Sequence, residues 1–112
     1  MKPRWDQIWD LKLAQIFAAS AERDAANAIL APVIVSSEGH RVAVACLKLA
    51  GGSLKELKEC AQAALTDYRD ILAWAEYPRQ MQLDVKATSE QKAAARRADA
   101  QEYTRWLDTT KT

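Results

Sequence analysis

The stretch VAVACLKLAGGSLKEL, residues 42–57, decides the fold of this chain. Its first apolar residues follow the spacing i, i+3, i+4 and i+7 of one helical face: Val42, Ala45, Cys46 and Leu49. Gly51 or Gly52 then supplies the left-handed residue that ends a helix. Ser53 and Glu56 have the spacing of a capping box, which begins the next helix. The stretch therefore predicts two antiparallel helices joined by a tight Gly-Gly turn.

Sparse Gly and Pro residues on both sides of this hairpin divide the chain into four predicted helices. Ser36 or Ser37 is the expected N-cap of the helix before the turn, and Pro78 ends the helix after it. Thr88 and Gln91 have capping-box spacing for a last helix. The predicted helices cover about residues 5–30, 37–50, 54–77 and 89–107. Because no linker is long enough to separate domains, we predict a single all-α domain, a three- to four-helix bundle over residues 1–112.

Residues 31–37, APVIVSS, interrupt the helical pattern. Pro32 disfavours a helical conformation of Ala31, and β-branched residues follow. We interpret the segment as an apolar connector packed on the core. A short strand that pairs with residues 81–85 is the alternative, because the sequence MQLDV alternates apolar and polar residues.

Two of the predicted helices carry wider apolar surfaces than a single neighbour covers. The arc of helix 5–30 is much wider than the stripe of about 100° that faces one neighbour, so this helix is either central or faces another chain. Helix 54–77 carries a second side, about a quarter-turn or more from its main face, that includes Ile71 and Trp74. The last helix has few apolar residues. We therefore expect more apolar surface than one copy covers.

Composition and charge exclude several classes of protein. Of 112 residues, 49% are apolar, and the net charge is only +1, which excludes a disordered chain. Residues 1–56 carry seven positive and six negative side chains, and residues 57–112 carry nine of each. No half of the chain is basic or acidic, so a nucleic-acid partner is not expected. No apolar run approaches the length of about 20 residues that crosses a bilayer, so no membrane partner is expected either.

The expected compartment is the cytoplasm. Cys46 and Cys60 are too few for a disulfide-stapled secreted domain, and free thiols fit a reducing compartment. Lys2 and Arg4 before an apolar stretch that ends in residues 18–21, AASA, imitate a signal peptide. Four polar residues interrupt that stretch where an export signal needs an unbroken apolar core: Asp6, Asp10, Lys12 and Gln15.

The sequence lacks the motifs of metal binding, nucleophilic catalysis and phosphate binding. It contains no Cys-x-x-Cys, His-Glu-x-x-His or Gly-x-Ser-x-Gly, and its three glycines form no phosphate loop. His40 and Cys46 lie six residues apart on one predicted helix, about 120° apart around its axis, so a Cys–His pair is not expected. We therefore predict that the chain is not an enzyme and has no catalytic residue, cofactor or metal ion.

Two alternative functions are kept. The Gly-linked hairpin resembles a helix-turn-helix in outline and makes a small DNA-binding protein one alternative, although the acidic residues of LKELKE, residues 54–59, cancel its lysines. A small-molecule site is the other alternative. Asp67 and Asp70 lie one turn apart near Trp74 and would form an acid/base pair if proximity raised one pKa.

The leading hypothesis is a protein-interaction module, expected to be a homodimer or to bind a helical partner. Four tryptophans are many for a small bundle, and tryptophan is enriched in the energetic centres of interfaces. Trp5 and Trp9 occupy adjacent turns near a terminus, and Trp74 and Ile71 lie off the main face of their helix. These four residues are the predicted interface.

Overall fold

The chain is all-helical in the part described by the computed structural model, residues 4–35 and 38–108. The helices run in the order α1 (Trp5–Ile16), α2 (Ser20–Ile34), α3 (Gly39–Ala50), α4 (Leu54–Glu76), α5 (Pro78–Gln82) and α6 (Ser89–Asp108). The predicted N-caps Ser36 and Ser37 lie outside the described residues. In the described residues, none of the helices has both the length and the apolar character to cross a bilayer.

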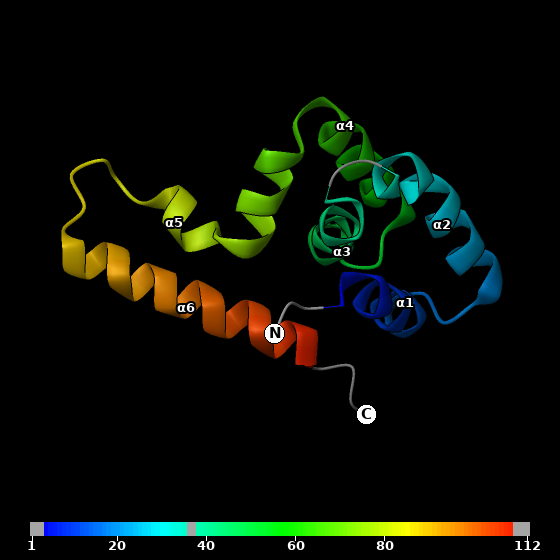
Figure 1. Ribbon diagram of the computed structural model, residues 1–112, viewed down its shortest axis with the longest axis horizontal. Coiled ribbons are helices and arrows are strands. Elements are labelled where there is room, and N and C mark those ends of the chain that lie inside the picture. Colours follow the sequence, from blue (N-terminus) through cyan, green and yellow to red (C-terminus); the bar gives the residue numbers. More distant parts are fainter. Residues whose placement is uncertain (1–3, 36–37, 109–112) are drawn as a thin grey trace.

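Helix α3 is the centre of the fold. Figure 1 shows it nearly end-on, surrounded by α1, α2 and α4, which together form what we call the body. Its residues from Val42 to Leu47 are all buried, so it has no polar face along this stretch. A helix that is apolar all round must be covered by neighbours on every side. Neighbouring helices therefore cover α3, whereas the sequence analysis offered helix 5–30 as the central one.

The junction between α3 and α4 follows from local sequence. Gly51 adopts the left-handed conformation, with φ of 60°, and its N–H donates to the carbonyl of Leu47. An L-residue with a side chain tolerates this conformation poorly, which explains the glycine. The Ser53 hydroxyl then accepts a hydrogen bond of 3.2 Å from the N–H of Glu56. The predicted N-cap of the following helix is confirmed.

The prediction of one helix over residues 5–30 is wrong, because the chain bends at residues 17–19 between α1 and α2. The bend buries Phe17, and Arg23 donates to the carbonyls of Phe17 and Ala18 that the bend frees. Both helices then pack against α3. Each of the two helices, α1 and α2, has one buried side of ordinary width. The wide apolar arc predicted for helix 5–30 therefore results from treating two helices as one.

The helix was predicted to end near residue 30, before Pro32, and this prediction is wrong. Pro32 lies inside α2, which continues to Ile34. A proline inside a helix removes one backbone hydrogen bond. Because Pro32 is near the end of α2, only a few helical residues follow it. Val33, directly after the proline, is buried, and its packing keeps this last turn helical.

A kink divides α4 at Asp67, whose φ of −154° and ψ of 97° are not helical. The Asp67 carboxylate accepts a hydrogen bond of 3.1 Å from the N–H of Arg69, which begins the second half of the helix. The kink rotates the second half relative to the first. Leu65, before the kink, is 57% exposed, whereas Ile71 and Leu72 after it are both buried. Of the predicted second apolar side of helix 54–77, Ile71 is thus buried in the core, whereas Trp74 is 45% exposed.

The helices α5 and α6, which we call the arm, extend away from the body (Figure 1). Helix α5 was not predicted, and Met81 and Gln82 belong to it, so the alternative strand over 81–85 is wrong. Helix α6 begins with the predicted capping box. The Thr88 N–H donates to Gln91 Oε1 at 2.9 Å, and the Gln91 N–H donates to Thr88 Oγ1 at 3.1 Å.

Asp99 of α6 fastens α5 to α6. Its carboxylate is 1% exposed and accepts the backbone N–H groups of Arg79 at 3.1 Å and Gln80 at 3.2 Å, in the first turn of α5. Burial alone raises the pKa of Asp99, but these hydrogen bonds outweigh it and hold the pKa below the ordinary value of 3.8. Asp99 is therefore a carboxylate cap supplied from another helix.

The far end of α6 docks on α1 through aromatic rings and a buried lysine. Tyr103 stacks on Trp106 and lies against Trp5, with ring centroids 5.9 and 6.5 Å apart. Lys12, 1% exposed, donates to the Trp106 carbonyl, and its Nζ lies 4.2 Å from the centre of the Trp106 ring. Burial lowers the pKa of Lys12, opposed by the charge of Asp108. Polar contacts thus hold both ends of the arm: those of Asp99 with α5 at one end and that of Lys12 with Trp106 at the other.

Candidate interaction surface

The four residues of the predicted interface are not brought together on one surface. Trp9 is 3% exposed and donates from its indole N–H to Asn27 at 3.3 Å, and Ile71 is 7% exposed. Both lie inside the chain, so their placement does not support a role in an interface. Trp5 is half-buried against Tyr103. Of the four, Trp74 is the one that lies open, with 45% of its surface exposed.

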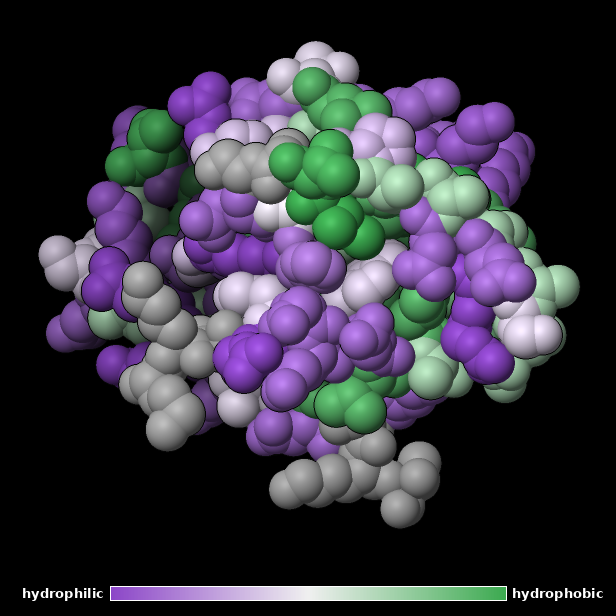
Figure 2. All heavy atoms as spheres, turned by 45° about the vertical axis from the view of Figure 1, so that its right-hand side comes forward, coloured by the Kyte–Doolittle hydropathy of each residue, from purple (hydrophilic) through white to green (hydrophobic). Residues whose placement is uncertain are grey.

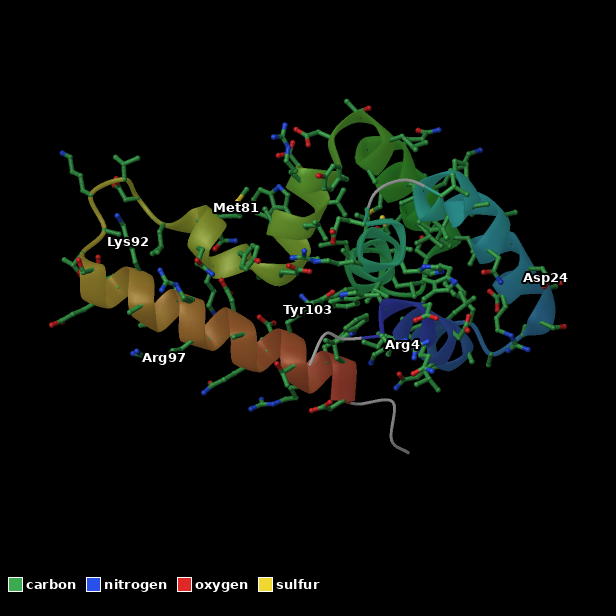
Figure 3. All side chains as sticks on the ribbon, in the orientation of Figure 1. Arg4, Asp24, Met81, Lys92, Arg97 and Tyr103 are labelled. Atoms are coloured by element: carbon green, nitrogen blue, oxygen red, sulfur yellow. The ribbon has the colours of Figure 1, made fainter. Side chains whose placement is uncertain are left out.

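Trp74 belongs to a group of exposed apolar side chains where α4 ends and α5 begins. Tyr77 and Met81, both 42% exposed, continue the group. Trp74 lies in the last turn of α4, and Tyr77 directly follows this helix as its C-cap. Figure 3 shows Met81 on α5, beside the second half of α4. We call Trp74, Tyr77 and Met81 the corner surface.

Tyr77 and Met81 were not among the predicted interface residues, because their exposure depends on the angle at which α5 follows α4. Residue 77 was the last position of a predicted helix, and residue 81 was placed in a loop or strand. Pro78, which starts α5, marks the break in the sequence but not the angle that follows it. The angle is set by Asp99, which holds the first turn of α5 from α6.

Elsewhere, large exposed apolar residues are distributed over separate elements: Leu11 in α1, Val35 after α2, Leu65 in α4 and Val85 before α6. Figure 2 shows a face of the molecule covered mostly by hydrophilic side chains, with hydrophobic ones gathered in its upper middle. Singly exposed apolar residues are normal on protein surfaces. The corner surface differs because it includes a tryptophan and groups three large side chains within eight residues of sequence.

The two cysteines are poor nucleophiles. Both are free thiols. Burial, together with the neighbouring Cys60, raises the pKa of Cys46 to about 12. Burial and the charges of Glu56 and Glu59 raise the pKa of Cys60. Because the thiolate is the reactive form, both side chains are held in the unreactive form at neutral pH. Among residues 4–35 and 38–108, His, Cys, Asp and Glu form no group of three that could hold a metal ion.

The acid/base pair of Asp67 and Asp70 that the small-molecule alternative would use gains no support from the placement of Asp67. Asp67 lies in the kink of α4 and is bound by Arg69, whose Nε lies 3.1 Å from Oδ1. Hydrogen bonds from the Arg69 side chain and backbone lower the pKa of Asp67. Asp67 is thus held as a carboxylate by Arg69, which is a structural role in the kink of α4.

The start of α4, which the DNA-binding alternative would use, presents charges of both signs. Its four charged residues are all exposed: Lys55, Glu56, Lys58 and Glu59. Phosphate contacts need an excess of positive charge, which this surface lacks. The placement of these residues therefore adds nothing in favour of that alternative.

No protein-family model, curated protein or solved structure significantly matches this chain.

Proposed function

We propose that the chain is a non-enzymatic protein-interaction module that self-associates through the corner surface. The exposure of the Trp74 indole carries this proposal. Burying a tryptophan against a partner removes a large apolar area from water, and tryptophan is among the residues that contribute most to interfaces. Tyr77 and Met81 enlarge the area around it and adapt to the shape of a partner. Trp5, Trp9 and Ile71 are not part of this surface.

The proposed partner is a second copy of this chain. In a two-fold contact, the same surface of both copies meets, so that surface must be complementary to itself. Trp74, Tyr77 and Met81 are uncharged, so no like charges meet when two copies of this surface come together. The net charge of +1 adds little repulsion between copies.

The test is sedimentation velocity of the full chain from tens to hundreds of micromolar. The parent is expected to increase in average mass with concentration, and Trp74→Ala is expected to remain monomeric with unchanged helicity. Leu65→Ala is the matched control, because Leu65 is an exposed apolar residue of the same helix before the kink. It should associate like the parent. A parent that stays monomeric, or association lost in Leu65→Ala but kept in Trp74→Ala, would contradict the proposal.

We also propose that α3 and α4 form the antiparallel, Gly-Gly-linked hairpin around which a helical bundle is built. The left-handed Gly51, the Ser53 cap and the extensive packing of α3 on α4 support it. The corner surface lies at the end of this hairpin that is far from Gly51 along α4. Its position therefore depends on the length of α4 and on the kink at Asp67.

We propose a cytoplasmic location. The support is that Cys46 and Cys60 are both free thiols, which fits a reducing compartment. Fractionation of cells that produce the full chain, followed by detection in the soluble cytoplasmic fraction or elsewhere, tests this directly.

A further inference from the structure

A cleft lies between α6 and the body. Its volume is about 350 Å³, and it is lined by Trp5, Arg41, Glu76, Tyr103 and Leu107. A second hollow of about 250 Å³ shares Glu76 and Tyr103 and continues along α6 to Arg96. Small-molecule sites usually have volumes from about 300 Å³ upward. We call the larger hollow the α6 cleft.

The charges around the α6 cleft favour an anion. Both Glu76 oxygens accept from Arg41, from Nε at 2.9 Å and from Nη2 at 2.6 Å, so this carboxylate is already neutralised. A third Arg41 N–H approaches Glu38 at 3.4 Å. A guanidinium has five N–H groups, so two remain on the Arg41 side chain, which is 30% exposed. Arg41 can therefore still bind an acceptor such as a carboxylate.

Two further cations lie near, and among the residues that the structure describes Glu76 is the carboxylate that lines the α6 cleft. Lys48 Nζ is 5.7 Å from the centre of the Tyr103 ring, and Arg96 lines the adjoining hollow. Among these five residues, Arg41, Lys48 and Arg96 are positive and Glu38 and Glu76 are negative, so this group carries one excess positive charge. A small anion is thus attracted, whereas a cation would meet a carboxylate that Arg41 already occupies.

The hydroxyl of Tyr103 is an independent indication of a ligand. The Tyr103 side chain is 9% exposed, and its hydroxyl oxygen has no hydrogen-bond partner among the described residues. Buried hydroxyls are ordinarily paired, and leaving one unpaired costs about 1–3 kcal/mol. Burial and the nearby Glu76 raise the pKa of Tyr103, opposed by Arg41, so the hydroxyl keeps its proton and can donate. Figure 3 shows Tyr103 on the side of α6 that faces the body.

The remaining walls suit a flat apolar ring. Trp5 is half-buried and contributes its indole, and Leu107 contributes an aliphatic side chain. Flat rings pack well against aromatic and aliphatic walls of this kind. A bare phosphate or sulfate would leave these walls uncovered.

We propose that the α6 cleft binds a small aromatic carboxylate. The carboxylate accepts from the two remaining N–H groups of Arg41 and from the Tyr103 hydroxyl, and the ring lies between Trp5 and Leu107. Bound in this way, the acid joins α6 to the body.

The test is an NMR titration of the ¹⁵N-labelled full chain with benzoate and with indole-3-carboxylate. Saturable shifts are expected at the Trp5 indole N–H and at the backbone of residues 103–107. Benzamide, which has the same ring without the charge, and inorganic phosphate, which has the charge without the ring, should bind at least about tenfold more weakly. Equal binding of benzamide or phosphate, or shifts confined to other residues, would overturn the proposal, as would the absence of any shift.

The decisive variant is Tyr103→Phe, which removes one oxygen and keeps the packing of the ring. We expect its affinity for the better-binding acid to fall about fivefold, while its thermal stability stays equal to or above that of the parent. Tyr68→Phe is the matched control, because it makes the same change in α4 outside the cleft, and it should bind like the parent. An unchanged affinity in Tyr103→Phe would overturn the assignment of the hydroxyl. Arg41→Ala, if folded, should lose most of the binding.

Discussion

In the body, α3 buries six consecutive residues, Val42 to Leu47, and each of them is apolar. In the arm, the longer helix α6 buries Ala95, Asp99 and Tyr103, of which one is a carboxylate and one has an unpaired hydroxyl. Apolar burial is non-directional and accumulates with area, whereas buried polar groups stabilise only in one geometry. The body is therefore held by its core, and the arm is held by a few specific contacts.

This difference matters for function because both proposed surfaces depend on the arm. The corner surface exists because Asp99 sets the position of α5, and the α6 cleft exists because Trp106 and Lys12 hold the end of α6 on α1. Regions with few buried apolar contacts open locally at lower free energy than a core does. We expect the arm to open without unfolding of the body.

The largest expected effect comes from Trp9→Ala in the body. Removing this buried indole leaves a cavity beside α3 and also removes the hydrogen bond to Asn27. The free energy of unfolding should fall by about 3–5 kcal/mol, measured by urea denaturation. Trp74→Ala removes the same side chain from an exposed position and should change it by less than about 1 kcal/mol. Similar losses in both variants would contradict the assignment of Trp9 to the core.

Gly39→Ala is expected to have the next largest effect. A Cβ at this position would lie 1.9 Å from the carbonyl oxygen of Ile34, so the backbone around the start of α3 must shift. We expect a loss of about 3 kcal/mol in urea denaturation, as for overpacked cores. Gly51→Ala is the control. It meets no atom within 4 Å and should lose only about 1–2 kcal/mol, from its left-handed backbone. The opposite order would contradict the close contact of Gly39 with α2.

Asp99→Asn should weaken the arm alone. The amide presents an N–H donor where the carboxylate accepted N–H groups from Arg79 and Gln80, at a cost of about 2 kcal/mol in the local opening of the arm. Hydrogen exchange should accelerate in α5 and α6 and stay unchanged in α3. Glu102→Gln, which removes an exposed partner of Arg79, should leave exchange nearly unchanged. Accelerated exchange in α3 would show that arm and body open together.

The same carboxylate makes the arm sensitive to acid. The pKa of Asp99 is lower in the folded chain than its ordinary value of 3.8, so its stabilising contribution is complete above that value and is lost as the pH falls through the folded pKa. In the parent, exchange in α5 should accelerate relative to α3 on acidification below about 3.8. The Asp99→Asn variant should lack this additional acceleration.

The smallest expected effect concerns Lys12. Burial lowers its pKa below 10.5, so the charged form costs stability at neutral pH, and this cost is relieved as the pH rises towards 10.5. Between neutral pH and 10.5, the stability of the parent should therefore rise relative to that of Lys12→Met. Lys55→Met, at an exposed position, should show no such relative change. A parent that loses stability relative to Lys12→Met would contradict the direction of the shift.

The sequence by itself determined the helical class and those helix boundaries that local chemistry encodes. Ser53 with Glu56 and Thr88 with Gln91 cap their helices by contacts within four residues, and Gly51 ends α3 through its own backbone freedom. Such features involve residues close in sequence, so they are readable without a fold.

Only the tertiary structure decided where helices bend, and with that which tryptophans are exposed. The bends at residues 17–19 and at Asp67 contain neither glycine nor proline, so the local sequence does not predict them. Burial of Phe17 and Ile71 in the core stabilises these bends. A bend changes the rotational phase of every residue after it. For this reason the wide apolar arcs predicted from the sequence do not correspond to exposed apolar surfaces. Of the four residues of the predicted interface, Trp74 is the one whose side chain is exposed.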